Sequence, residues 1–220
     1  MQMKTQTSSS ELSHFPVMLS EIIEISNPSK GGFFIDCTFG GGSYSKELLK
    51  FSKTKVVGFD RDSAVVSIAK ELEQKFKERF KFYHLKFSQM SKVLPNQADV
   101  IIFDLGLSSI QLNNLQRGFS FKSKDKLDMS MGLTDTSAEE AINKLSESNL
   151  KLIIKIFGEE KEASKIASSI VKAREKKKIT KVDELVSIIE KSKKRNFSKK
   201  INPSTKTFQA LRIFVNKEIS

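Results

Sequence analysis

DCTFGGGSYS, at residues 36–45, is the stretch of sequence that decides the fold. It begins at the end of a short apolar run at residues 33–37 and precedes a helical pattern at residues 46–51. Glycines in such a place let the chain turn tightly and let its backbone approach a ligand closely. The amino end of the following helix would present free N–H groups. The stretch predicts a strand, a ligand-binding loop and a helix, although a simple strand-to-helix turn has the same pattern.

Strand and helix patterns alternate on the C-terminal side of this loop. A second strand is expected at residues 55–60, where an apolar run ends on Asp60. Residues 63–79 have helical spacing, and further strands are expected at residues 80–85 and 99–105. Strands separated by helices of this length form right-handed βαβ units. We therefore expect an α/β fold with a parallel, doubly wound sheet.

Beyond Arg117 the pattern becomes helical without strands. Helices are expected at residues 137–144, 148–157, 159–175 and 182–191, followed by a polar linker at 193–205 and an amphipathic helix at 207–219. The sequence thus predicts four parts. These are an N-terminal arm and helix at 1–30, a Rossmann-like part at 31–124, an all-helical insertion at 125–205 and a return helix at 206–220.

Composition excludes several classes of protein. The chain has 220 residues, 38% of them hydrophobic, and it contains one cysteine and two histidines. A disulfide framework and a Cys-rich zinc site are therefore excluded, and we expect no metal. The first 13 residues are polar and lack the apolar segment of a secretion signal, and no apolar run approaches a membrane span. We expect a cytoplasmic protein.

Two carboxylates have the spacing of a nucleoside-cofactor site. Asp60 lies 20 residues after Gly40, the separation at which an acidic side chain can accept hydrogen bonds from ribose hydroxyls. Asp104 ends the fourth predicted strand, which would lie beside the first at the switch point of the sheet. The alternatives are an exposed Asp60 at a strand end and an Asp104 that caps the next helix.

The positive charge is concentrated in one region. The net charge is +12, and residues 172–206 hold 13 basic against 4 acidic residues, a surplus of 9. A phosphate-contacting surface on the helical insertion would explain this distribution, and so would a solvated helix face with a loose linker. The RNA-binding candidates are Lys176, Lys177, Lys178, Lys193, Lys194, Arg195, Lys199 and Lys200.

Six motifs taken together resemble the MraW family of ribosomal RNA small-subunit methyltransferases. They are HFPVML at 14–19, DCTFGGG at 36–42, FDLGLSS at 103–109, RGFSF at 117–121, LDM at 127–129 and TFQALRI at 207–213. The resemblance runs from about residue 14 to 218. It implies a Rossmann-like class I methyltransferase that uses S-adenosylmethionine (SAM) to methylate N4 of a cytosine in the decoding region of 16S rRNA. The partner would be the small ribosomal subunit, and a homodimer is left open.

The same resemblance implies a set of cofactor-binding residues. Gly42, Ser43 and Tyr44 would line the methionine part of SAM, and Asp60 would hold the ribose. Phe87 would lie near the adenine, whereas Asp104 and Gln111 would complete the pocket. The full cofactor-binding set is Gly42, Ser43, Tyr44, Asp60, Phe87, Asp104 and Gln111. Asp104 is also the candidate to accept a hydrogen bond from the target amine, and no catalytic base is assigned.

The chain departs from the family pattern in four residues and in length. Ser43, Ile110, Ser130 and Asn202 stand where the family has Gly, Pro, Arg and His. The family adds three strands after the return helix, so we expect an incomplete sheet of four strands with a bare edge at the fourth. The alternatives are a truncated, non-catalytic RNA-binding remnant and an NAD-dependent oxidoreductase. The loop lacks the third glycine of the dinucleotide fingerprint, which disfavours the oxidoreductase.

Overall fold

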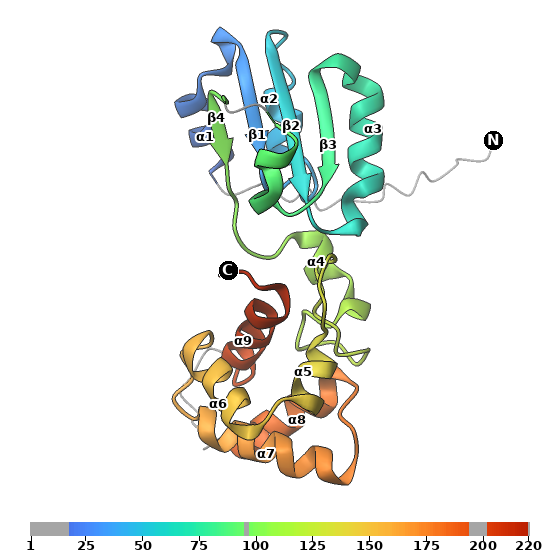
Figure 1. Ribbon diagram of the computed structural model, residues 1–220, viewed down its shortest axis with the longest axis vertical. Helices are drawn as coiled ribbons and strands as arrows, with labels where there is room; N and C mark the ends of the chain where they lie inside the picture. The colour runs from blue at the N-terminus through green and yellow to red at the C-terminus, as the bar shows by residue number, and fades with distance from the viewer. Residues whose placement is uncertain (1–17, 95–96, 194–201, 220) are drawn as a thin grey trace, which may run out of the picture.

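The computed structural model describes residues 18–94, 97–193 and 202–219. Its N-terminal half contains a four-stranded sheet with the order β3-β2-β1-β4 (Figure 1). The strands are β1 (Gly32–Asp36), β2 (Thr54–Asp60), β3 (Phe80–His84) and β4 (Val100–Ile102), and each pairing is parallel. The parallel α/β sheet is confirmed, with β1 and β4 adjacent as expected. β4 is shorter than the predicted strand at 99–105.

The two faces of the sheet are covered by different elements. Alternate residues of a strand point to opposite faces, so Phe34 and Ile35 of β1 belong to separate apolar clusters. On one face lie α1 (Leu19–Ser26), α2 (Ser43–Leu48) and α3 (Val66–Phe76), together with Val65 of the 3₁₀ turn η2 (Ser63–Val65). Two further 3₁₀ turns, η1 (Pro28–Lys30) and η3 (Lys77–Arg79), follow α1 and α3 in the chain. The other face is covered by η4 (Phe87–Lys92), through Met90.

The C-terminal half is a helical unit with its own core. Its helices are α5 (Ala138–Lys144), α6 (Glu147–Ile156), α7 (Ala163–Lys176), α8 (Val182–Ser192) and α9 (Thr205–Asn216). Side chains such as Ile154, Ile166 and Leu185 are fully buried between them. The expected helical insertion is therefore present, and its helices begin and end within four residues of the predicted limits.

The packing of two segments differs from the expected division of the chain. Phe208, Leu211 and Val215 of α9 pack in the helical core against α5 and α6, although we expected residues 206–220 to return to the sheet domain. Phe119 also lies in the helical core, although the predicted Rossmann-like part extends to residue 124. The apolar side chains of both segments are therefore buried in the helical core.

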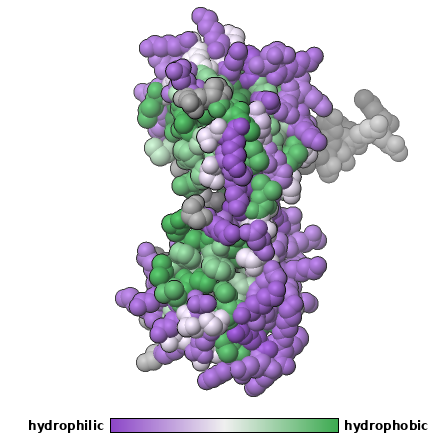
Figure 2. Space-filling view, viewed as in Figure 1, coloured by the Kyte–Doolittle hydropathy of each residue, from purple (hydrophilic) through white to green (hydrophobic). Residues whose placement is uncertain are grey.

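The two halves meet through a narrow middle, which the space-filling view shows clearly (Figure 2). The chain passes through it along α4 (Ser109–Asn113) and η5 (Leu115–Arg117) (Figure 1). Within the described residues, no helix is long and apolar enough to cross a membrane.

Candidate cofactor site and RNA-binding surface

The glycine loop lies between β1 and α2, at the carboxyl end of the sheet. Gly42 precedes α2 with φ 73°, and a Cβ there would lie 2.6 Å from the ring of Phe39. Only glycine fits this position without strain. A Cβ added to Gly41 would meet nothing within 4 Å, so the backbone there faces open space. The loop therefore combines a tight turn with an accessible main chain, as a ligand-binding loop requires.

Asp60 holds this loop against the end of β2. Its Oδ2 accepts a hydrogen bond from the Gly40 N–H at 2.8 Å, and its Oδ1 accepts one from the Asp62 N–H at 2.9 Å. Burial raises the pKa of the Asp60 carboxyl despite these hydrogen bonds. The 20-residue spacing thus corresponds to a direct contact between the carboxylate and the glycine loop.

Asp104 meets the same loop from the end of β4. The Tyr44 hydroxyl donates to Asp104 Oδ2 at 3.3 Å, and the Asp104 N–H donates to Thr38 Oγ1 at 2.8 Å. Burial, followed by the charge of Asp104, raises the pKa of Tyr44 to about 12, so the phenol remains a donor at neutral pH. The N-cap of α4 is Ser108, so Asp104 does not cap that helix. The exposed Asp104 carboxylate can face a ligand.

Asp36 is a third carboxylate in this region, and sequence reasoning gave it no role. It is fully buried, accepts a 2.7 Å hydrogen bond from the Ser45 hydroxyl and accepts a second from the Thr38 N–H. Burial, with a smaller contribution from the charge of Asp60, raises its pKa to about 6 against the opposing effect of these hydrogen bonds. An acidic residue at the end of a buried apolar strand was the available signal.

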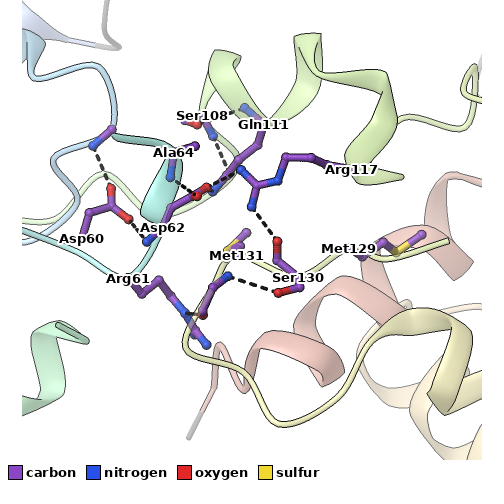
Figure 3. Close-up of polar contacts among 12 residues, drawn as sticks. Asp60, Arg61, Asp62, Ala64, Ser108, Gln111, Arg117, Met129, Ser130 and Met131 are labelled. Atoms are coloured by element: carbon purple, nitrogen blue, oxygen red, sulfur yellow. Dashed lines mark hydrogen bonds and ion pairs between the residues drawn. The ribbon is translucent and has the colours of Figure 1, made fainter. Parts of the chain in front are cut away.

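Gln111 belongs to a buried polar network around Asp62 (Figure 3). Its Nε2 donates to Asp62 Oδ2 at 2.9 Å, and its Oε1 accepts from the Ser108 N–H. Arg117 Nη1 donates to the same Asp62 oxygen at 2.6 Å, whereas Arg117 Nη2 donates to the Ser130 carbonyl at 2.6 Å. The network joins the turn after β2 to the segments that lead into the helical unit.

Phe87 lies across the carboxyl end of the sheet. Its ring contacts Phe103 edge to face, with centroids 5.3 Å apart. Because Phe87 follows β3 and Phe103 follows β4, the contact spans the two outer strands. Both rings remain partly exposed, at 36% and 47%. An aromatic surface is therefore available beside the carboxylates.

The basic residues of the helical unit fall into distinct environments. Lys176 is exposed near the end of α7. The next two lysines are also exposed but form ion pairs, Lys177 with Glu184 at 2.7 Å and Lys178 with Glu139 at 2.5 Å.

Lys193 differs from these exposed lysines. Its ammonium contacts Glu160 at 2.5 Å and the Pro203 carbonyl, and its side chain is only 15% exposed. Its charge is therefore used within the protein. The remaining candidates lie outside the described residues, as does most of the first sequence motif; these candidates are Lys194, Arg195, Lys199 and Lys200.

Comparison with known proteins gives a consistent result. The model of the MraW methylase family matches residues 11–220. The ribosomal RNA small subunit methyltransferase H of Orientia tsutsugamushi (strain Boryong) is 45% identical over 212 residues, covering 94% of this chain and 68% of the relative. The proteins of the same name from Maricaulis maris and Rickettsia akari are 42% and 43% identical, with 63% and 67% of their lengths covered. The chain thus spans about two thirds of the length of these relatives.

Proposed function

Because the chain belongs to the MraW methylase family, we propose that it transfers a methyl group from SAM to N4 of a cytosine in the decoding region of 16S rRNA. The observation that carries this proposal is the meeting of the glycine loop, Asp60 and Asp104 at the carboxyl end of the sheet. The shared name of the relatives, ribosomal RNA small subunit methyltransferase H, supports an rRNA substrate. The cofactor and the target atom are our proposals.

The residues at the carboxyl end suit SAM chemically. SAM carries ribose hydroxyls and an ammonium group that need acceptors, and its sulfonium is positively charged. The side-chain oxygens of Asp60 and Asp104 can accept such hydrogen bonds. The open backbone at Gly41 leaves room for close approach. We propose that Gly42, Ser43 and Tyr44 line the methionine part.

The rest of the pocket would hold the nucleoside part of SAM. Asp60 would bind the ribose hydroxyls, and the exposed ring of Phe87 would contact the adenine. Gln111 would close the pocket from α4, where its amide is already held by Asp62 and Ser108. A side chain held in this way is preorganised, since it needs no reordering when a ligand binds.

Asp104 is our candidate for orienting the target amine. The lone pair of an exocyclic cytosine amine is delocalised into the ring, so alignment must supply much of the rate enhancement. When bound, SAM supplies an electrophilic methyl group. The Asp104 carboxylate would accept a hydrogen bond from the amine, and Tyr44 and Thr38 hold Asp104 in place. The cytosine must leave its stack to reach this carboxylate.

The helical unit is our candidate for holding the RNA. Its excess of lysines favours phosphate contacts, which position a substrate without recognising its sequence. Lys176 is the best-placed described candidate because it is exposed and its charge is not used in a buried pair. We propose that Lys177 and Lys178 add to the same positive surface, since their ion pairs are also exposed.

Calorimetric titration with S-adenosylhomocysteine (SAH) tests the cofactor site. We expect micromolar binding that is lost in Asp60→Ala and absent for NADH. Transfer of labelled methyl groups to small ribosomal subunits that lack the modification then tests the reaction, with Asp104→Ala as the inactive control. A folded chain that binds small-subunit RNA but neither binds SAH nor transfers methyl groups would support the non-catalytic RNA-binding alternative instead.

A further inference from the structure

Asp62 is a buried carboxylate to which neither the family resemblance nor the proposed mechanism assigns a role. Its side chain is almost fully buried, at 1% exposure. Asp62 lies two residues after the end of β2 and is the N-cap of η2. It accepts hydrogen bonds from the Ala64 N–H at 3.0 Å, from Gln111 Nε2 and from Arg117 Nη1. These three donors come from three segments of the chain. Asp62 is therefore a point at which several segments are fixed to one another (Figure 3).

One side of this network leads to the proposed cofactor pocket. The Asp62 N–H donates to Asp60 Oδ1, and the other oxygen of Asp60 accepts from the Gly40 N–H of the glycine loop. Asp62 also fixes the amide of Gln111. The orientation of two proposed cofactor-binding residues thus depends on the turn that Asp62 anchors.

The other side leads to the helical unit. Arg117 joins Asp62 to the Ser130 carbonyl, and the neighbouring Arg61 donates to the carbonyls of Gly132 and Asn216, the last residue of α9. A Cβ on Gly132 would lie 2.5 Å from the Arg61 carbonyl oxygen, so the two segments approach closely. The turn after β2 therefore carries contacts to both halves of the molecule.

We propose that Asp62 is a positioning residue that holds the cofactor pocket, through Gln111 and the turn carrying Asp60, in a fixed relation to the helical unit, through Arg117. The inference rests on the proposed function of the site. A buried carboxylate with charged and neutral donors stabilises one arrangement of these donors, because each donor would otherwise lose its partner. Loss of the Asp62 charge would leave the largely buried Arg117 guanidinium without its counter-charge. It would also free the Gln111 amide to reorient.

The chain offers a matched control at the far end of the helical unit. Glu160 and Lys193 form an ion pair with side-chain exposures of 6% and 15%, against 2% and 16% for Asp62 and Arg117. Both pairs are buried to the same degree, so breaking either one should cost similar stability. Only the Asp62 pair touches the proposed cofactor residues.

The first test measures SAH binding by calorimetry in the parent chain, in Asp62→Asn and in Glu160→Gln, well below the melting temperature of each. We expect Asp62→Asn to weaken SAH binding about tenfold, and Glu160→Gln to leave it within about twofold of the parent. Asp62→Glu keeps the charge but displaces it by one methylene, so it should also weaken binding; it carries the test if Asp62→Asn does not fold. Unchanged SAH binding in the folded Asp62 variants overturns the inference. Failure of the parent chain to bind SAH overturns the proposed function as well.

The second test addresses the link to the helical unit through Arg117. Arg117→Lys retains a positive charge beside Asp62 but cannot reach Asp62 and Ser130 together, because a lysine lacks the guanidinium fork. We expect the KM for small ribosomal subunits to rise several-fold, with kcat and SAH affinity within about twofold of the parent. A general loss of stability would not produce this separation of KM from kcat. An unchanged KM would overturn the link between the two halves.

Discussion

The carboxylate of Asp36 should lower the stability of this protein at neutral pH. It is fully buried, and its pKa rises from the ordinary 3.8 to about 6, mainly through burial. A pKa that is higher in the folded state means that folded protein binds the proton more tightly, so stability falls as pH rises from 3.8 through 6. At pH 8 the cost of the ionised group is about 3 kcal/mol, since each pKa unit corresponds to about 1.4 kcal/mol.

Asp36→Asn removes this cost and can keep two of the hydrogen bonds that Asp36 makes. The amide oxygen can accept from the Thr38 N–H, and the amide nitrogen can donate to the Ser45 hydroxyl, which then acts as an acceptor. We expect the variant to be more stable than the parent by up to about 3 kcal/mol at pH 8 and by only about half of that at pH 5. Its affinity for SAH should fall, because the negative charge beneath the loop is lost.

Urea denaturation of both proteins at pH 5, 6.5 and 8 measures the difference directly. Ser45→Ala provides a control, because it removes one hydrogen bond from Asp36 but leaves the carboxyl group in place. The pH dependence of its stability should therefore resemble that of the parent. A difference between Asp36→Asn and the parent that is the same at pH 5 and pH 8, or a variant less stable at pH 8, would refute the reasoning.

Three further predictions concern the loop, the helical core and the RNA surface. Gly42→Ala should cost about 1–3 kcal/mol, because a Cβ would clash with the ring beneath it and the backbone has φ 73°; thermal unfolding measures this, and an unchanged melting temperature would contradict it. Glu160→Gln should lower the free energy of unfolding, measured by urea denaturation, by about 3 kcal/mol, because Lys193 would remain buried without its counter-charge. An unchanged free energy of unfolding would show that water can solvate the Lys193 ammonium in the variant. Lys176→Gln should lower the salt-dependence slope of rRNA binding by about 0.7–0.9, whereas Lys70→Gln on the exposed face of α3 should not change it.

The secondary structure of this chain could largely be predicted because its patterns are local. Apolar runs define the strands, and helical periodicity defines α5 to α9. The prediction was less accurate at β4, where the strand stops at Ile102 although the apolar pattern continues to Leu105. Strand pairing requires a neighbour, and β4 pairs only with β1 among the described strands. A pattern of side chains does not contain this information.

The candidate site could be predicted only for residues whose places in the fold follow from the order of strands along the sequence. Asp60 and Asp104 follow strands that end at the same edge of the sheet, so their positions follow from the parallel order. The roles of Asp62 and Arg117 could not be predicted, because they depend on the contact between segments 55 residues apart. The packing of α9 also depends on tertiary contacts, since an amphipathic helix fits any apolar surface of the right shape.

The charge at the carboxyl end of the sheet supports the proposed SAM cofactor over a dinucleotide. Asp36, Asp60 and Asp104 follow or end three neighbouring strands, and Asp60 and Asp104 both act on the same loop. A pyrophosphate placed at this helix N-terminus would face these carboxylates and be repelled, whereas an ammonium or sulfonium would be attracted. The arrangement therefore favours a cationic nucleoside cofactor over a dinucleotide. It also gives a physical reason for keeping Asp36 despite its cost, because replacement by a neutral residue would weaken the attraction that selects the cofactor.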